Sequence, residues 1–65
     1  MTLLERFGDT HLRYALRNAS VLDVVREGAV WRGYARRPGA HVGVEIDAAC
    51  NPTELLQRLE RRFAA

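Results

Sequence analysis

Three side chains of this sequence have types that could carry acid–base, nucleophilic or metal chemistry: Cys50, His11 and His41. A thiol just before a helix start is a candidate nucleophile, because helix N-termini favour the thiolate. We nevertheless interpret Cys50 as a small buried apolar side chain and His11 as a packed histidine on an apolar helix face. A nucleophilic enzyme needs a Ser or Cys, a nearby His and an orienting acid. These candidates do not assemble into such a set, so we predict that the protein is not an enzyme.

The sequence predicts no metal or cofactor site. His41 falls on the same face of an expected strand as Glu45 and Asp47, which suits a weak metal or acid–base site, but alternation alone produces such a solvated face. One Cys and two His are too few for a structural zinc site with four such ligands. There is no P-loop, no Gly-rich dinucleotide fingerprint and no spaced Cys/His set. We expect no catalytic residue, no metal and no cofactor.

The stronger signal is a ribbon rich in arginine and aromatic residues, comprising Trp31, Arg32, Tyr34, Arg36, Arg37 and Pro38. A second group of arginines lies near the end of the chain, at Arg58, Arg61 and Arg62. Such residues are enriched at protein–protein hot spots, and they also contact phosphates and stack on bases. Because the acidic residues are spread through the chain and the net charge is only +2, we expect these residues to contact protein, with nucleic acid as the alternative partner.

A chain of 65 residues has room for one domain, over residues 1–65. A domain this small buries only about 60% of the surface that its unfolded form exposes, so it usually needs a staple or a partner. A single Cys makes no internal disulfide, so we expect a homo-oligomer or a larger assembly. No apolar run of 18 residues and no signal-peptide pattern occur, which predicts no membrane segment. The lone Cys50 fits a reducing cytoplasm.

The first expected element is a helix over about residues 3–17. Thr2 and Glu5 have the spacing of a capping box, and apolar residues recur at helical steps at Leu4, Phe7, Leu12, Ala15, Leu16 and Ala19. Gly8 costs roughly 1 kcal/mol inside a helix, and residues 12–17 also alternate like a strand. A short helix that ends near Gly8 and is followed by a strand is therefore the alternative for this segment.

Three antiparallel strands in a meander are expected next, over about residues 20–26, 29–36 and 41–47. Glu27-Gly28 closes one turn, and Arg37-Pro38-Gly39-Ala40 closes the next with Pro and Gly at its central positions. Side chains of the second strand alternate between the two faces of the sheet. One face carries Val30, Arg32, Tyr34 and Arg36, and the other carries Ala29, Trp31, Gly33 and Ala35. In the third strand, the face that we expect to be covered carries Val42, Val44 and Ile46.

A final helix is predicted over residues 52–63. Asn51 is a good cap, Pro52 suits the first helical position, and Glu54 is placed to return a capping-box bond. The apolar stripe of this helix consists of Leu55, Leu56, Leu59 and Phe63. The predicted fold class is α+β: a helix, a three-stranded antiparallel meander and a second helix, with both helices packed on one face of the sheet.

This order of elements resembles the small head–tail joining proteins of long-tailed phages, whose fold is a helix, a β-hairpin and a second helix. The similar residues are Val24-Val25-Arg26-Glu27-Gly28 leading into Val30-Trp31, and Asn51-Pro52-Thr53-Glu54-Leu55. A second connector family of phage heads is similar at Gly28-Ala29-Val30, Arg32-Gly33 and Pro38. The chain departs from the first family by its longer β region around residues 36–40, and from the second by its shortness and final helix. The resemblance implies a structural protein that forms a ring at the portal vertex, with no catalytic residues.

These observations predict a non-catalytic structural or interaction protein that acts in a multimer. Its location is expected to be the cytoplasm, or a virion if the phage resemblance holds. The alternative is a small nucleic-acid-binding or regulatory protein that uses the ribbon of arginine and aromatic residues. Binding that weakens steeply as salt rises would identify that alternative.

Overall fold

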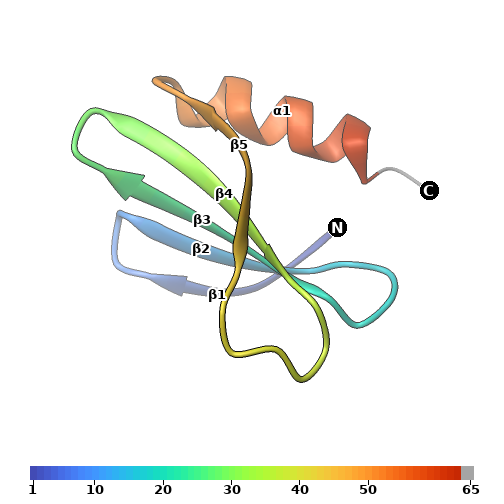
Figure 1. Cartoon of the computed structure of the whole chain (residues 1–65). Coiled ribbons are helices and arrows are strands. Elements are labelled where there is room, and N and C mark those ends of the chain that lie inside the picture. Colours follow the sequence, from blue (N-terminus) through green and yellow to red (C-terminus); the bar gives the residue numbers. More distant parts are fainter. Residues whose placement is uncertain (64–65) are drawn as a thin grey trace.

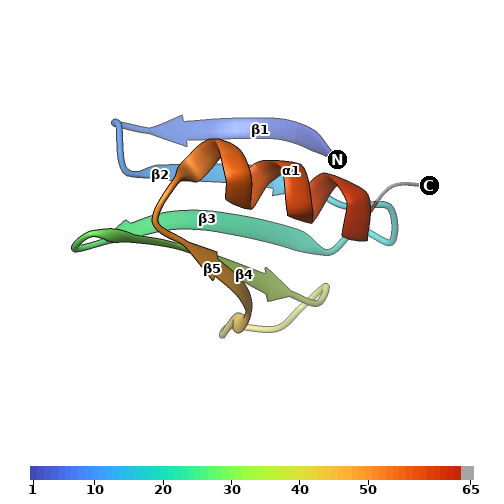
Figure 2. The same ribbon diagram turned by 90° about the horizontal axis from the view of Figure 1, so that it is seen from above.

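The computed structural model describes residues 1–63, which form one antiparallel sheet of five strands followed by one helix. The elements in chain order are β1 (Thr2–Phe7), β2 (His11–Ala15), β3 (Val21–Glu27), β4 (Val30–Arg36), β5 (Val44–Ala49) and α1 (Pro52–Arg62). Each strand pairs with the next along the chain, so β1 and β5 are the two edges of the sheet. The helix crosses one face of the sheet, as Figures 1 and 2 show. The opposite face, which we call the open face, has no helix over it in residues 1–63.

The predicted N-terminal helix over residues 3–17 is wrong, because this segment forms the β1–β2 hairpin. Phe7 pairs with His11 across a turn at residues 8–10, and Gly8 has a φ of +64° in that turn. That backbone conformation ends any right-handed helix, and glycine adopts it without a steric penalty. The alternative prediction is right that a strand follows Gly8, since β2 lies there, but wrong about a short helix before it. The fold is therefore mostly β, with strands first.

The three expected strands are present as β3, β4 and β5, but they are the last three of five strands rather than the whole sheet. The β3–β4 hairpin turns at residues 28–29 with a φ of +64° at Gly28, which is typical of a type II′ turn. The turn at Pro38 and Gly39 is also as expected. Gly39 has a φ of +79°, and the Ala40 amide donates to the Arg37 carbonyl oxygen at 3.0 Å.

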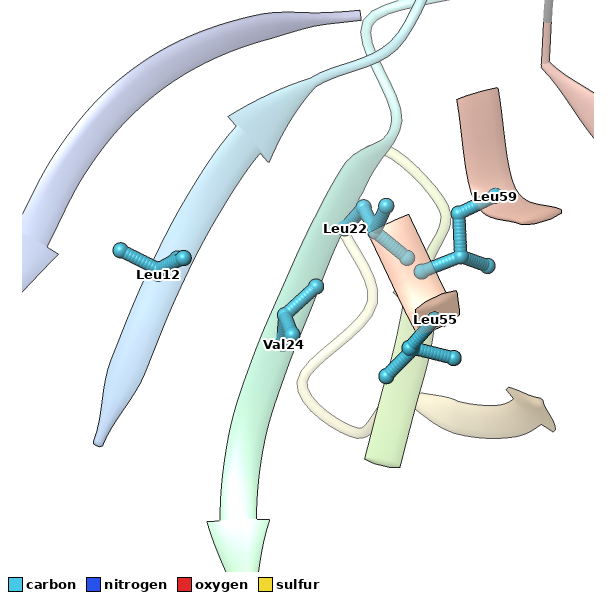
Figure 3. Close-up of a cluster of buried hydrophobic side chains, with 5 residues drawn as sticks. All are labelled: Leu12, Leu22, Val24, Leu55 and Leu59. Carbon is cyan, nitrogen blue, oxygen red and sulfur yellow. The ribbon is translucent and has the colours of Figure 1, made fainter. Parts of the chain in front are cut away.

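The buried core consists of five aliphatic side chains, contributed by β2, β3 and α1: Leu12, Leu22, Val24, Leu55 and Leu59. Figure 3 shows Leu22 and Val24 facing the two helix leucines, with Leu12 further along the sheet. Gly33 in β4 lets the helix approach, since a Cβ at this position would lie 3.1 Å from Leu59 Cδ1. Hydrophobic burial by one helix on this face is therefore the main source of stability.

The expected core face of β5 is wrong in two of its three residues. Val42 and Val44 are 78% and 68% exposed, whereas Ile46 packs against the core. The strand begins only at Val44, and the β4–β5 register shifts at Tyr34, which leaves Ile46 as an extra residue in β5. Such a bulge breaks the simple alternation on which the prediction rests. The expectation of two helices on this face also fails, because the described chain has only α1.

The C-terminal helix is confirmed. The Asn51 side-chain oxygen accepts hydrogen bonds from the amides of Thr53 and Glu54, at 2.8 and 3.4 Å, and Pro52 occupies the first turn. The expected stripe faces the sheet: Leu55 and Leu59 are fully buried, and Leu56 and Phe63 are partly buried. Instead of completing a capping box, the Glu54 carboxylate accepts a hydrogen bond from Arg58 at 3.1 Å.

Candidate functional site

The most exposed element of the sheet is the edge strand β1. All six of its residues are exposed, and the large apolar side chains Leu3, Leu4 and Phe7 are 47%, 55% and 37% accessible. Within residues 1–63, β1 pairs only with β2, so its outer backbone N–H and C=O groups have no strand beside them. Free strand edges are natural templates for pairing with another chain, and natural proteins usually protect them with charges, proline or short length. The sequence prediction missed this surface because it placed the same residues on a helix.

A charged cluster lies on the open face where β1, β2 and β3 meet. One carboxylate oxygen of Asp23 contacts both His11 Nε2, at 2.7 Å, and Arg13 Nε, at 2.8 Å. The Phe7 ring lies against His11 with centroids 4.6 Å apart, and the Arg13 guanidinium carbon is 4.9 Å from the Phe7 centroid. Burial acts to raise the pKa of Asp23, but the hydrogen bonds from Arg13 and His11 outweigh it and hold this pKa below its usual value.

The contacts of His11 with Asp23 and Phe7 give this side chain a structural role in the sheet. An Asp–His pair is part of many catalytic triads, but a triad also needs a nucleophile within hydrogen-bond reach of the imidazole. No Ser, Thr or Cys side chain forms a hydrogen bond with His11 in the described residues. His11 lies in β2 and its side chain packs on the open face of the sheet. We expected it on the apolar face of the predicted N-terminal helix, which is absent. The arrangement therefore ties three strands together.

A second charged group on the open face joins β3, β4 and β5. Arg32 contacts Glu27 at 2.9 Å and Glu45 at 3.1 Å, and the Tyr34 hydroxyl donates to the Glu27 carboxylate at 2.9 and 3.0 Å. The hydrogen bond to Glu27, with smaller contributions from burial and from nearby carboxylates, raises the pKa of Tyr34. Exposed ion pairs of this kind contribute little to stability. They do, however, occupy two side chains that were predicted to contact a partner.

The remaining predicted interaction residues are scattered over the molecule. Trp31 is half-buried and packs against the core on the helix side, away from Arg32 and Tyr34. Arg58 is held by Asp47, at 2.9 and 3.0 Å, and by the Ala48 carbonyl oxygen, at 2.6 Å; this contact lowers the pKa of Asp47. Other members of the predicted set are exposed at the helix end, Arg61 and Arg62, or in the β4–β5 turn, Pro38. The ribbon is therefore split between both faces, and its role in binding stays a prediction.

Two of the predicted residues, Arg36 and Arg37, come together in a pocket of about 780 Å³. Apolar side chains from β4, β5 and the residues that follow β2 and α1 also line it. A third arginine, Arg17 from the β2–β3 loop, lies at the same pocket and was not singled out in the sequence. Only the topology, which brings the β2–β3 and β4–β5 connections to one end of the sheet, places these three residues together.

The other candidate chemical groups remain apart. Asp47 contacts Arg58 on the helix side while Glu45 contacts Arg32 on the open face, so the bulge at Ile46 breaks the shared face expected for His41, Glu45 and Asp47. In residues 1–63, no group of three His, Cys, Asp or Glu side chains is placed to hold a metal ion. Cys50 is exposed, which corrects the expectation of a buried side chain.

No helix in residues 1–63 is long and apolar enough to cross a membrane.

Comparison with known proteins adds no further assignment: no protein-family model, no curated protein and no solved structure matches this chain.

Proposed function

We propose that the protein is a non-catalytic interaction module that works as a homo-oligomer, with two copies joined through the outer edge of β1. One observation carries this proposal: an edge strand on which every residue is exposed, including three large apolar side chains. The lone, exposed Cys50 supports a reducing compartment such as the cytoplasm. The phage resemblance, whose similar residues lie within 24–38 and 51–55, stays a prediction; the order of elements that it implies lacks its first helix, because β1 and β2 take that place.

The small core of the domain supports a need for further burial. Within residues 1–63, five apolar side chains are buried, all contributed by β2, β3 and α1. The helix packs its leucines against β2 and β3 and comes closest by backbone to β4 and β5, whereas its backbone makes no close approach to β1. A second copy paired along β1 supplies backbone hydrogen bonds and covers Leu3 and Leu4 at the same time. Small domains commonly obtain missing burial from such an isologous interface, in which each copy uses the same surface.

The sequence of β1 is compatible with antiparallel pairing to itself. In a two-fold pair the axis runs perpendicular to the sheet and passes through one residue of β1, because facing residues of antiparallel strands lie on the same face of the sheet. An axis at Leu4 sets Leu4 of each copy opposite Leu4 of the other. Axes at Glu5 or Arg6 set like charges directly opposite each other, which is destabilising, so charge favours the register centred on Leu4.

The mass of the protein in solution tests this proposal, measured by light scattering over a series of concentrations. We expect a dimer that dissociates on dilution. Leu4→Lys should yield a monomer with unchanged circular dichroism, because two added charges meet at the two-fold interface. Val42→Lys is the matched control, since Val42 is also an exposed apolar side chain but lies outside β1, and it should remain dimeric. A wild-type monomer at all concentrations, or equal behaviour of the two variants, contradicts the proposal.

Nucleic-acid binding is the alternative function, and the structure gives it less support. Arg32 and Tyr34 contact Glu27, and Trp31 packs on the opposite face, so the ribbon presents no continuous stacking surface. A titration with DNA or RNA at rising salt distinguishes the two functions. Binding that falls steeply with salt, with no dependence on Leu4, would favour the alternative.

A further inference from the structure

The pocket at the end of the sheet has an apolar lining that reaches in from several elements. Leu16 follows β2, Ala35 lies in β4, Val44 begins β5 and Phe63 follows α1, and all four line the same space of about 780 Å³. Figures 1 and 2 show the β2–β3 loop and the C-terminal end of α1 at one end of the molecule. Binding sites for small molecules are concave, mostly apolar and of roughly 300–1,000 Å³. The size and lining of this pocket fall within that description.

The polar part of the pocket is positively charged. Arg17, Arg36 and Arg37 line it together with Asn18 and Ser20, and no acidic side chain is among the lining residues. Within residues 1–63, none of the three guanidinium groups forms an ion pair, whereas Arg13, Arg32 and Arg58 all do. Three like charges around an apolar space repel each other, and a bound anion relieves that repulsion. The guanidinium group matches carboxylate geometry with two parallel hydrogen bonds.

We propose that this pocket binds a single-chain amphiphile with an anionic head, of the fatty-carboxylate class. The apolar chain lies against Leu16, Val44 and Phe63, and the carboxylate contacts the arginines. The site is separate from the β1 edge in the fold, so it is independent of the proposed oligomerisation. The β2–β3 loop at this pocket is closed by the hydrogen bond from the Leu16 amide to the Ser20 carbonyl oxygen, at 2.9 Å.

Decanoate is the probe for this site, measured by calorimetry and by amide chemical shifts below the concentration at which it forms micelles. Decanol and decyltrimethylammonium share the chain but carry no charge or the opposite charge. We expect decanoate to bind at least roughly tenfold more tightly than either, because hydrogen bonds to a charged group contribute about 1.5–3 kcal/mol and each 1.4 kcal/mol is a factor of ten. Shift changes should centre on residues 16–20, 35–37 and 42–44.

Matched variants separate specific binding from a general effect of charge. Arg36→Gln combined with Arg37→Gln should weaken decanoate binding about tenfold, while Arg61→Gln, on the exposed side of α1, should leave it unchanged. Val44→Glu should abolish binding by placing a carboxylate in the pocket. Equal affinity for the three probes, shift changes outside the pocket, or an equal loss from Arg61→Gln overturns the proposal. Failure of decanoate to bind, with a change of mass caused by Val44→Glu, would instead assign the pocket to a contact between copies and also overturn it.

Discussion

The segment from β3 to α1 and the β1–β2 hairpin use their apolar side chains in opposite ways. In the first, Leu22, Val24, Leu55 and Leu59 are fully buried between sheet and helix. In the second, Leu12 is the only residue of the buried core, and Leu3, Leu4 and Phe7 are exposed. The difference indicates that the C-terminal segment supplies most of the folding stability, while the hairpin adds an interaction edge to it.

The largest expected effect is at the centre of the C-terminal core. Leu59→Ala should lower the free energy of unfolding by about 3 kcal/mol, because it leaves a cavity under the helix next to Gly33. Leu4→Ala in the hairpin should change it by less than about 0.5 kcal/mol in dilute, monomeric protein. Urea denaturation of both variants measures the difference. If Leu59→Ala proves unfolded, Leu56→Ala, at a partly buried site of the same stripe, should give an intermediate loss. Equal losses in the two regions would break the comparison.

Asp23 connects the two regions, because it lies in β3 and binds His11 and Arg13 of β2. Asp23→Asn should cost about 1–2 kcal/mol of stability, since it removes a charged acceptor that is only 16% exposed. Asp9→Asn, in the exposed β1–β2 turn, is the control with little expected effect.

The pH dependence of Asp23 follows from its lowered pKa. The folded protein holds the Asp23 pKa below its value of about 3.9 in the unfolded chain, so the unfolded state takes up the proton first. The stabilising contribution is therefore complete above about pH 4 and is lost as the pH falls through the folded pKa. Denaturation at several pH values should show the difference between wild type and Asp23→Asn shrinking in acid. A difference that stays constant down to low pH would show that the carboxylate charge is not its cause.

The cap of α1 contributes a smaller effect within the C-terminal segment. Asn51→Ala removes the acceptor for the Thr53 and Glu54 amides and should cost about 1 kcal/mol. Asn51→Ser should restore most of this stability, because a serine hydroxyl accepts the same bonds. Thermal unfolding of the three proteins provides the measurement. A loss that serine does not rescue would assign the effect to something other than the cap.

The smallest effect is expected at the loop that joins the two regions, and its sign is opposite. Ala19 has a φ of +63°, a left-handed conformation that is unfavourable for a residue with a Cβ. Ala19→Gly should therefore raise the stability by about 0.5 kcal/mol, after the greater flexibility of glycine in the unfolded chain is subtracted. Thermal unfolding detects this change. A lower midpoint for the variant would show that the loop tolerates alanine without strain.

Sequence reasoning succeeded for the C-terminal helix and the last three strands because their signals are local. Asn51-Pro52 marks a helix start, and Gly28 and Gly39 mark turns regardless of what packs nearby. The helix predicted for the N-terminal segment is wrong because Leu4, Phe7 and Leu12 recur at helical spacing although this segment forms β1 and β2. Gly8 followed by Asp9 is a turn signal, and in the structure these residues lie in the turn between β1 and β2.

The candidate site was less predictable than the fold. Arg36 and Arg37 were selected by residue type, and both line the pocket. Arg17 joins them only through the meeting of two loops, which no local pattern encodes. Likewise, the exposed edge of β1 is a property of the strand order, and the bulge at Ile46 decides which of Glu45, Ile46 and Asp47 reach the helix.

Amide hydrogen exchange in β1, compared at low and high protein concentration, tests the central claim most directly. If two copies pair along this edge, protection of amides in residues 3–7 rises with concentration, while protection in β3 remains nearly constant. Leu4→Lys should abolish that rise. If the β1 amides exchange equally fast at every concentration, the edge is free in solution and the proposed homo-oligomer is contradicted.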